Sequence, residues 1–175
     1  MTDAIAFSRL VRVDALPKDG LRQVIEANPA ERAALAALNG LPAIARLTAD
    51  LRLTRAGRGG VRVHGEVLAE ATQTCVVTLE PIEAIVREEI DVRFAPPAAV
   101  GAARNPGAEE IIAMTDADGP DPIVDGKIDL GALAAEFFAL GLDPYPRKPG
   151  VAYDPQQEEQ PESLPFSALG KREPE

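Results

Sequence analysis

Hydrophobic and polar residues change their spacing along this chain, and each spacing predicts one kind of element. Apolar side chains occupy every second position of residues 47–53, and residues 61–69 largely repeat this pattern after the glycine-rich stretch 55–60. Such alternation is typical of a strand with one buried and one solvated face. The two runs therefore predict an antiparallel hairpin, and a third alternating run over residues 82–94 extends it to a meander.

Shorter strand candidates and one irregularity complete the β pattern. Residues 7–13 alternate moderately, and residues 21–25 are long enough for a short strand. The second strand of the hairpin is expected to continue to Leu79, with a bulge or bend near Ala71. Residues 111–114 are a further strand candidate inside an otherwise irregular region.

Two segments carry the signals that begin helices, and the first follows Asn28. Asn28 can cap a helix, Pro29 suits its first position, and Glu31 stands where a capping box needs it. Leu35 and Leu38 are expected on the buried side of this helix. At about eleven residues the helix is too short to be stable alone, so it must pack on another element.

The second predicted helix follows Asp129, which can act as its cap. Ile128 and Leu133 are placed as a hydrophobic staple around that cap, and Gly141 ends the helix. The apolar stripe of this helix is expected to consist of Leu130, Leu133, Ala134, Phe137 and Leu140.

These elements predict an α+β fold, with an antiparallel sheet of about four to six strands packed by two helices. Curling of the sheet toward a barrel is left open. We expect one domain over residues 1–150, with a mobile acidic insertion at about 95–126, because prolines, glycines and acids dominate that stretch. Residues 151–175 are expected to form an acidic, largely disordered tail, in which the apolar patch 165–169 could dock back onto the domain.

Composition narrows the classes of function. The chain has a single cysteine, which excludes an intrachain disulfide and is typical of a reducing compartment. Its first residues lack the basic and apolar regions of a signal peptide, and no apolar run reaches the roughly 18 residues that a membrane span needs. We therefore expect a cytoplasmic protein without a membrane partner. Only 4% of the residues are aromatic, which limits the surfaces that could stack on nucleic-acid bases.

Charge is distributed unevenly along the chain. Residues 1–75 contain ten Lys and Arg against eight Asp and Glu, a net of +2, whereas residues 76–175 contain eight against twenty, a net of −12. The first half includes a basic ridge with Asp50 as its one interspersed acid, and the ridge consists of Arg46, Arg52, Arg55, Arg58 and Arg62. Such a ridge can hold a phosphate backbone, and it can equally be a solvated strand face and hairpin tip.

Few residues could carry catalysis or bind a metal ion. His64 and Cys75 supply the one imidazole and the one thiol, and a catalytic pair would need direct contact and an orienting third group. A structural zinc site usually has four Cys or His ligands, so zinc is not expected. The glycines of residues 57–60 form no phosphate-binding motif, and the acids of residues 116–125 lack the spacing of a calcium loop. The sequence predicts a protein that is not an enzyme and has no cofactor.

A family pattern runs through nearly the whole chain. Its pieces, in order, are Phe7-Ser-Arg, Val61-x-Val63-x-Gly65, Gln73-Thr-Cys-Val-Val-Thr-Leu-Glu-Pro81, Ile128-Asp-Leu130, Pro144-Tyr-Pro-Arg-Lys-Pro-Gly150 and Pro165-Phe-Ser-Ala-Leu169. In this order they resemble the YceD family of large ribosomal RNA subunit accumulation proteins. The central motif consists of Cys75, Thr78, Leu79, Glu80 and Pro81. Its Cys-Val-Val-Thr form is similar to the alphaproteobacterial branch.

Other branches of the family carry a Cys-x-x-Cys pair at this motif, and some carry a second pair after the C-terminal helix. Thr78 stands here in place of the second thiol, so a metal role implied by the family is not expected for this chain. The resemblance implies a non-enzymatic factor that supports the synthesis, processing or stability of large-subunit ribosomal RNA.

Two modes of action are open for such a factor. As an RNA- or ribosome-precursor-binding module, the protein would contact phosphates of large-subunit ribosomal RNA or its precursor through the basic ridge, together with Arg147 and Lys148. As a protein-interaction adaptor, it would bind a basic partner such as a ribosomal protein through its acidic insertion and tail.

Overall fold

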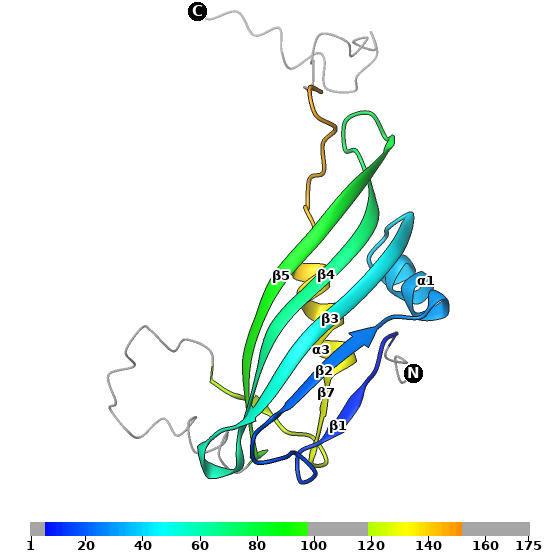
Figure 1. Ribbon diagram of the computed structural model, residues 1–175. Coiled ribbons are helices and arrows are strands. Elements are labelled where there is room, and N and C mark those ends of the chain that lie inside the picture. The colour runs from blue at the N-terminus through cyan, green and yellow to red at the C-terminus, as the bar shows by residue number, and fades with distance from the viewer. Residues whose placement is uncertain (1–5, 98–118, 152–175) are drawn as a thin grey trace, which may run out of the picture.

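The computed structural model describes residues 6–97 and 119–151 (Figure 1). The elements are β1 (Leu10–Arg12), β2 (Leu21–Glu26), α1 (Pro29–Leu38), β3 (Ala43–Arg55), the short 3-10 turn η1 (Gly57–Gly59), β4 (Val61–Thr74), β5 (Pro81–Ala95), β6 (Asp121–Pro122), β7 (Lys127–Asp129) and α3 (Leu130–Leu140). The predicted strand at residues 111–114, the tail from residue 152 onward and the apolar patch 165–169 lie outside the described residues.

The main sheet has five strands in the order β2-β3-β4-β5-β6, and every pair is antiparallel except β5 with β6. A second sheet pairs β1 with β7, which are more than 110 positions apart in the sequence. The α+β prediction is confirmed. Within the described residues β2 and β6 are the two free edges of the main sheet and do not pair with each other, so the sheet is open and no barrel forms.

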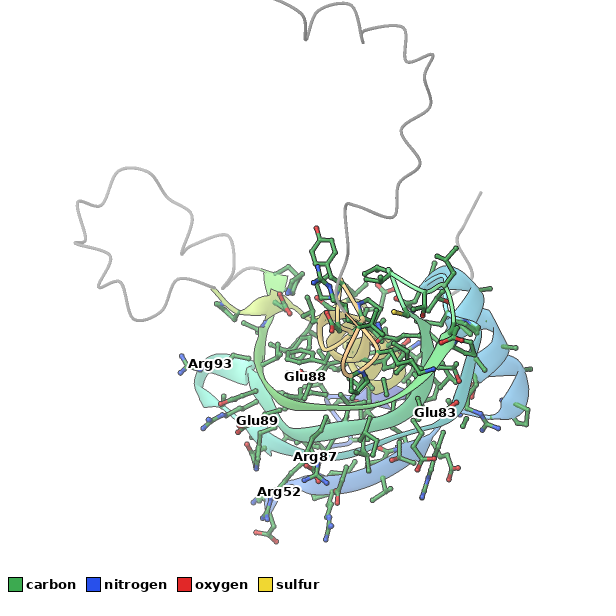
Figure 2. All side chains as sticks on the ribbon, turned by 90° about the horizontal axis from the view of Figure 1, so that it is seen from above. Arg52, Glu83, Arg87, Glu88, Glu89 and Arg93 are labelled. Carbon is green, nitrogen blue, oxygen red and sulfur yellow. The ribbon has the colours of Figure 1, made fainter. Side chains whose placement is uncertain are left out.

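Alternation along β3 and β4 buries one face of this sheet, as predicted. Leu47, Leu51 and Leu53 of β3 are almost fully buried, and the intervening positions of the strand are more exposed. The sheet curves around α3, which lies on the concave face (Figure 2). Gly65 permits a close approach between β3 and β4, because a Cβ atom there would lie 2.0 Å from the carbonyl oxygen of Asp50.

The predicted bulge and the predicted end of the second hairpin strand need correction. The pairing register of β3 with β4 shifts at residues 44–46 of β3. The irregularity therefore lies on β3, opposite Ala71, and not on β4, which contains Ala71. The strand β4 ends at Thr74 instead of continuing to Leu79, because the chain turns at once after Thr74 to begin β5.

Both helices begin where the sequence predicts, but their buried faces differ slightly from expectation. In α1, Leu35 is buried and Leu38 is 75% exposed, because Ala36 shares the side that packs on β3. In α3, Phe138 rather than Phe137 is fully buried, and Leu140 is 72% exposed. The buried stripe of α3 follows positions i, i+4 and i+8 from Leu130, which turns it away from Leu140.

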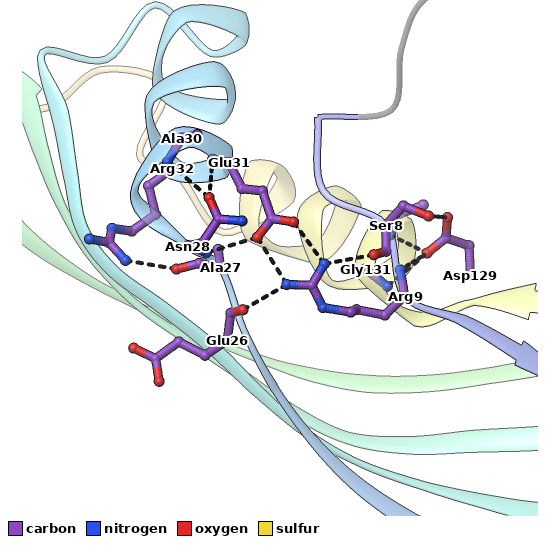
Figure 3. Close-up of polar contacts among 11 residues, drawn as sticks. Ser8, Arg9, Glu26, Ala27, Asn28, Ala30, Glu31, Arg32, Asp129 and Gly131 are labelled. Atoms are coloured by element: carbon purple, nitrogen blue, oxygen red, sulfur yellow. Dashed lines mark hydrogen bonds and ion pairs between the residues drawn. The ribbon is translucent and has the colours of Figure 1, made fainter.

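A polar network joins the first turns of the two helices (Figure 3). The Asp129 carboxylate accepts hydrogen bonds from the backbone N–H groups of Gly131 and Arg9 and from the Ser8 hydroxyl, at 3.0, 2.7 and 2.5 Å. The Arg9 guanidinium donates to both carboxylate oxygens of Glu31, at 2.7 and 3.0 Å. Glu31 also accepts from the backbone N–H of Asn28, which completes the predicted capping box.

The N-terminal segment packs against α3 so closely that a glycine is required at the contact. A Cβ atom at Gly131 would lie 2.8 Å from the Phe7 carbonyl oxygen and from the Ser8 Cα atom, and both of these are backbone atoms. We predict that Gly131→Ala lowers the free energy of unfolding by about 1–3 kcal/mol, the usual cost of overpacking a rigid contact. Urea denaturation measures this change.

Gly57→Ala is the matched control for that substitution, because a Cβ atom at Gly57 would meet nothing within 4 Å and the residue has no positive φ. We expect its free energy of unfolding to stay within about 0.5 kcal/mol of the unmodified protein. Equal effects of the two substitutions would contradict the close packing of Gly131.

Candidate functional site

Two segments that are far apart in the sequence meet at one end of the sheet. The hairpin turn (residues 75–80) connects β4 to β5, and the strap (residues 143–148) follows α3 and runs toward that turn (Figure 1). The backbone N–H of Val76 donates to the Pro146 carbonyl at 2.9 Å, and the buried Gln73 side chain donates to the Asp143 carbonyl at 2.8 Å. The fold therefore brings the two most distinctive pieces of the family pattern into contact.

Backbone hydrogen bonds make the hairpin turn tight. The N–H of Cys75 donates to the Glu80 carbonyl at 2.8 Å, and the N–H of Leu79 donates to the Cys75 carbonyl at 2.9 Å. Leu79 has a φ of 60°, in the left-handed region that costs a non-glycine residue roughly 1–2 kcal/mol. Its side chain is 77% exposed. Strained backbone conformations that surrounding contacts maintain are often found at functional positions.

The sulfur atom of Cys75 is the centre of the contact between the turn and the strap. Cys75 is fully buried, and its Sγ accepts hydrogen bonds from the backbone N–H groups of Thr78 and Lys148, each at 3.4 Å. The Thr78 side chain, followed by these backbone donors, lowers the thiol pKa from 9.0 to about 6. Hydrogen bonds to the sulfur stabilise the thiolate, which explains the direction of the shift.

An ion pair closes the same contact at the surface. The Lys148 ammonium lies 2.7 Å from a Glu80 carboxylate oxygen, which raises the pKa of the lysine and lowers that of the glutamate. The Thr78 hydroxyl oxygen lies in the same turn and accepts a hydrogen bond from the backbone N–H of Glu80 at 3.4 Å. In the described part of the chain no group of three or more His, Cys, Asp or Glu side chains is placed to hold a metal ion.

Side chains that project from this end form an exposed surface that we call the apical patch. It consists of Val76 and Leu79 of the hairpin turn and Tyr145 and Arg147 of the strap. Leu79 and Tyr145 are 77% and 71% exposed, and Val76 is 46% exposed. Arg147 is also exposed, and within residues 6–97 and 119–151 its side chain has neither a hydrogen-bond nor an ion-pair partner. The patch thus combines an aromatic ring and a cation from the strap with apolar groups from the hairpin turn.

The basic ridge predicted from the sequence is distributed over several environments. Arg62 forms a bidentate ion pair with Asp91, at 2.7 and 2.5 Å. Arg55 donates to the backbone carbonyl of Leu16 at 2.5 and 3.2 Å, where it ties the end of β3 to the N-terminal loop. The side chain of Arg58 lies outside the described part of the structure. Arg55 and Arg62 therefore have local structural partners.

Arg46 and Arg52, the other two members of the ridge, are exposed on β3. Neither has a side-chain partner among the described residues. Arg52 projects from the convex face of the sheet, together with Arg87 and Glu89 (Figure 2). That face is of mixed charge, because acids stand between its arginines, as in the Arg22–Asp50 pair with contacts of 2.9 and 2.5 Å.

The structure separates the predicted cations into two regions. The ridge lies along β3 and β4, whereas Arg147 and Lys148 lie on the strap at the hairpin turn. Sequence reasoning did not single out Tyr145 or Val76. Tyr145 appeared only within the family pattern at residues 144–150, because its exposure depends on where α3 directs the strap.

The chain belongs to the family described as large ribosomal RNA subunit accumulation protein YceD, whose family model matches residues 63–171. The match covers more than half of the chain and includes both the hairpin turn and the strap. This description names an accumulation factor and no reaction. No curated protein and no solved structure matches the chain. No helix in the described ranges is both long enough and apolar enough to cross a membrane.

The depressed pKa of Cys75 predicts a pH-dependent stability. Between pH 6 and pH 9 the folded thiol is ionised while the unfolded thiol is protonated, so raising the pH favours the folded state. This contribution is complete above the unfolded pKa and is lost as the pH falls through about 6. We expect the stability difference between the unmodified protein and Cys75→Ser to grow from pH 6 to 9 and then to level off in urea denaturation.

Thr78→Val is the companion variant, because it removes the largest cause of the pKa shift and keeps the shape of the side chain. We expect it to move the rise in stability toward higher pH. A difference between unmodified protein and Cys75→Ser that is constant across this range would show that the buried sulfur remains a neutral thiol.

Proposed function

We propose that this protein is a cytoplasmic, non-enzymatic binding factor that supports large-subunit ribosomal RNA, and that it contacts RNA of the precursor particle through the apical patch. Membership of the accumulation-protein family supports the ribosomal role. The observation that carries the RNA contact is that the strap presents an exposed Tyr145 and an Arg147 without a partner in the described parts of the chain.

The chemistry of this pair suits single-stranded or looped RNA. Protein recognition of RNA depends largely on unpaired bases that stack on aromatic side chains or arginines, with cations at the phosphates. A tyrosine and an arginine two positions apart on the strap supply both groups. Hydrogen bonds from Val76 and Lys148 hold the strap in place, so little conformational entropy would be lost on binding.

The acidic character of the chain limits where RNA can bind. A formal net charge of −10 repels RNA at long range, so contact is favoured where cations are locally free. Arg147 meets this condition, and so do Arg46 and Arg52 on β3, which we propose as secondary phosphate contacts. Acidic surface elsewhere would suppress indiscriminate binding.

A binding titration with labelled single-stranded RNA tests this proposal. We predict that Tyr145→Ala weakens binding about tenfold or more, because base–aromatic stacking is worth roughly 1–3 kcal/mol per base. Arg147→Ala should also lower the salt dependence of the affinity by about one phosphate contact. Fluorescence anisotropy at several salt concentrations measures both effects.

Ile85→Ala and Arg22→Ala are the matched controls. Ile85→Ala removes an exposed apolar side chain outside the apical patch, and Arg22→Ala removes an exposed cation outside it. We expect affinities within about twofold of the unmodified protein for both. Loss of binding in Arg46→Ala with Arg52→Ala, but not in the patch variants, would place RNA on the sheet instead. Unchanged binding in all variants would reject RNA contact at either surface.

The same variants test the cellular role. In a host that lacks the protein, Tyr145→Ala combined with Arg147→Ala should fail to restore the level of large-subunit ribosomal RNA, whereas the two controls should restore it. Full restoration by the patch variant would separate the cellular role from the apical patch.

A further inference from the structure

A groove lies at the end of β5 that is opposite the hairpin turn. It is bounded by β1, β6, β7 and the first half of α3, and its volume is about 460 Å³, within the roughly 300–1,000 Å³ of ordinary ligand pockets. Its apolar surface includes Leu10, Phe94, Val124 and Leu133. Leu10 and Val124 are 62% and 65% exposed, so the groove presents two bulky aliphatic side chains to solvent.

Three carboxylates stand on the rim of this groove. They belong to Asp121 in β6, Asp125 in the turn before β7, and Glu136 in α3, and all three residues are exposed. None of these carboxylates has a hydrogen-bond or ion-pair partner among residues 6–97 and 119–151. Elsewhere on the surface, acids such as Asp50 and Asp91 are neutralised by neighbouring arginines.

The other two charged residues of the groove leave its rim net negative. Asp129 also lines the groove, but its carboxylate is already occupied by hydrogen bonds from Ser8, Arg9, Gly131 and Ala132. Lys127 supplies the single cation of the lining. Three free carboxylates against one ammonium group favour a cationic occupant and disfavour a nucleic acid.

The walls of the groove are preformed by backbone hydrogen bonds. The Val124 carbonyl accepts from the Lys127 N–H at 2.9 Å, and the Gly126 carbonyl accepts from the Val13 N–H at 3.0 Å. Asp125 has a φ of 50°, which Asp tolerates better than most residues. The turn that presents Val124 and Asp125 is therefore fixed to the body of the protein, and a ligand need not order it.

We propose that this groove binds a cationic peptide segment of a partner protein, with lysines or arginines at the rim carboxylates and a bulky apolar side chain against Leu10 and Val124. The charge of the rim and the exposed aliphatic walls are complementary to this one kind of occupant. The groove is independent of the apical patch, and it gives the basic-partner hypothesis a described site on the folded domain.

Titration of the full chain with a labelled synthetic peptide of alternating lysine and leucine tests the site. We predict saturable binding that weakens with added salt and that falls about tenfold when Asp121→Asn, Asp125→Asn and Glu136→Gln are combined, the combined effect of three exposed ion pairs. The double variant Leu10→Ser with Val124→Ser should also weaken binding of this peptide. Its effect on a peptide in which serine replaces every leucine should be smaller, because that peptide has no apolar side chain to lose.

Two control variants match these changes outside the groove. Asp19→Asn, Glu26→Gln and Glu70→Gln remove three exposed carboxylates, and Leu38→Ser with Ile85→Ser removes two exposed aliphatic side chains. We expect both controls to bind the peptide within about twofold of the unmodified protein. Urea denaturation of all variants checks that each is folded under the conditions of the titration.

Three outcomes would overturn the proposal. Equal weakening by the rim variant and its carboxylate control would show that only the net charge attracts the peptide. Weakening by neither groove variant would place the peptide elsewhere. A dimer that light scattering detects, and that Leu10→Ser with Val124→Ser dissociates, would assign the groove to a second copy of this chain.

Discussion

Coverage of the apolar, concave face of the main sheet is the constraint on which the rest of this structure depends. The long strands β3, β4 and β5 bury alternate side chains on one face, and α3 lies in the concavity of that face (Figure 2). The position of α3 is set at its first turn, where Asp129 binds the N-terminal segment and Gly131 allows the backbone to approach it. The strap, which continues the chain after α3, begins from the end of this positioned helix.

The strap shows how packing at one place organises a site at another. Because α3 ends near the sheet, its C-terminal continuation reaches the turn between β4 and β5, where Lys148 and Pro146 bond to Cys75 and Val76. Donor groups of the protein surround the Cys75 sulfur and stabilise its ionised form. The hydrogen bonds between the hairpin turn and the strap can therefore hold Tyr145 in a fixed place.

The two ends of the sheet differ in chemistry. Among the residues that the structure describes, one end presents an aromatic ring and an arginine without a partner. The other presents unpaired carboxylates and exposed aliphatic groups. Surfaces of opposite charge favour opposite kinds of partner. A protein with a high net negative charge can carry both surfaces because they lie at opposite ends of β5. Salt screens the charges of one end from those of the other.

Local chemistry within the sequence determined the element types, the caps at Asn28 and Asp129, and the central hairpin, because alternation and capping depend on residues a few positions apart. The sequence also indicated that Cys75 would have no partner thiol. Only the tertiary structure decided the pairing of β1 with β7, the contact of the strap with the hairpin turn, and which arginines are neutralised. Those contacts join residues separated by about 30 to 120 positions, and their energies depend on geometry that no local pattern contains.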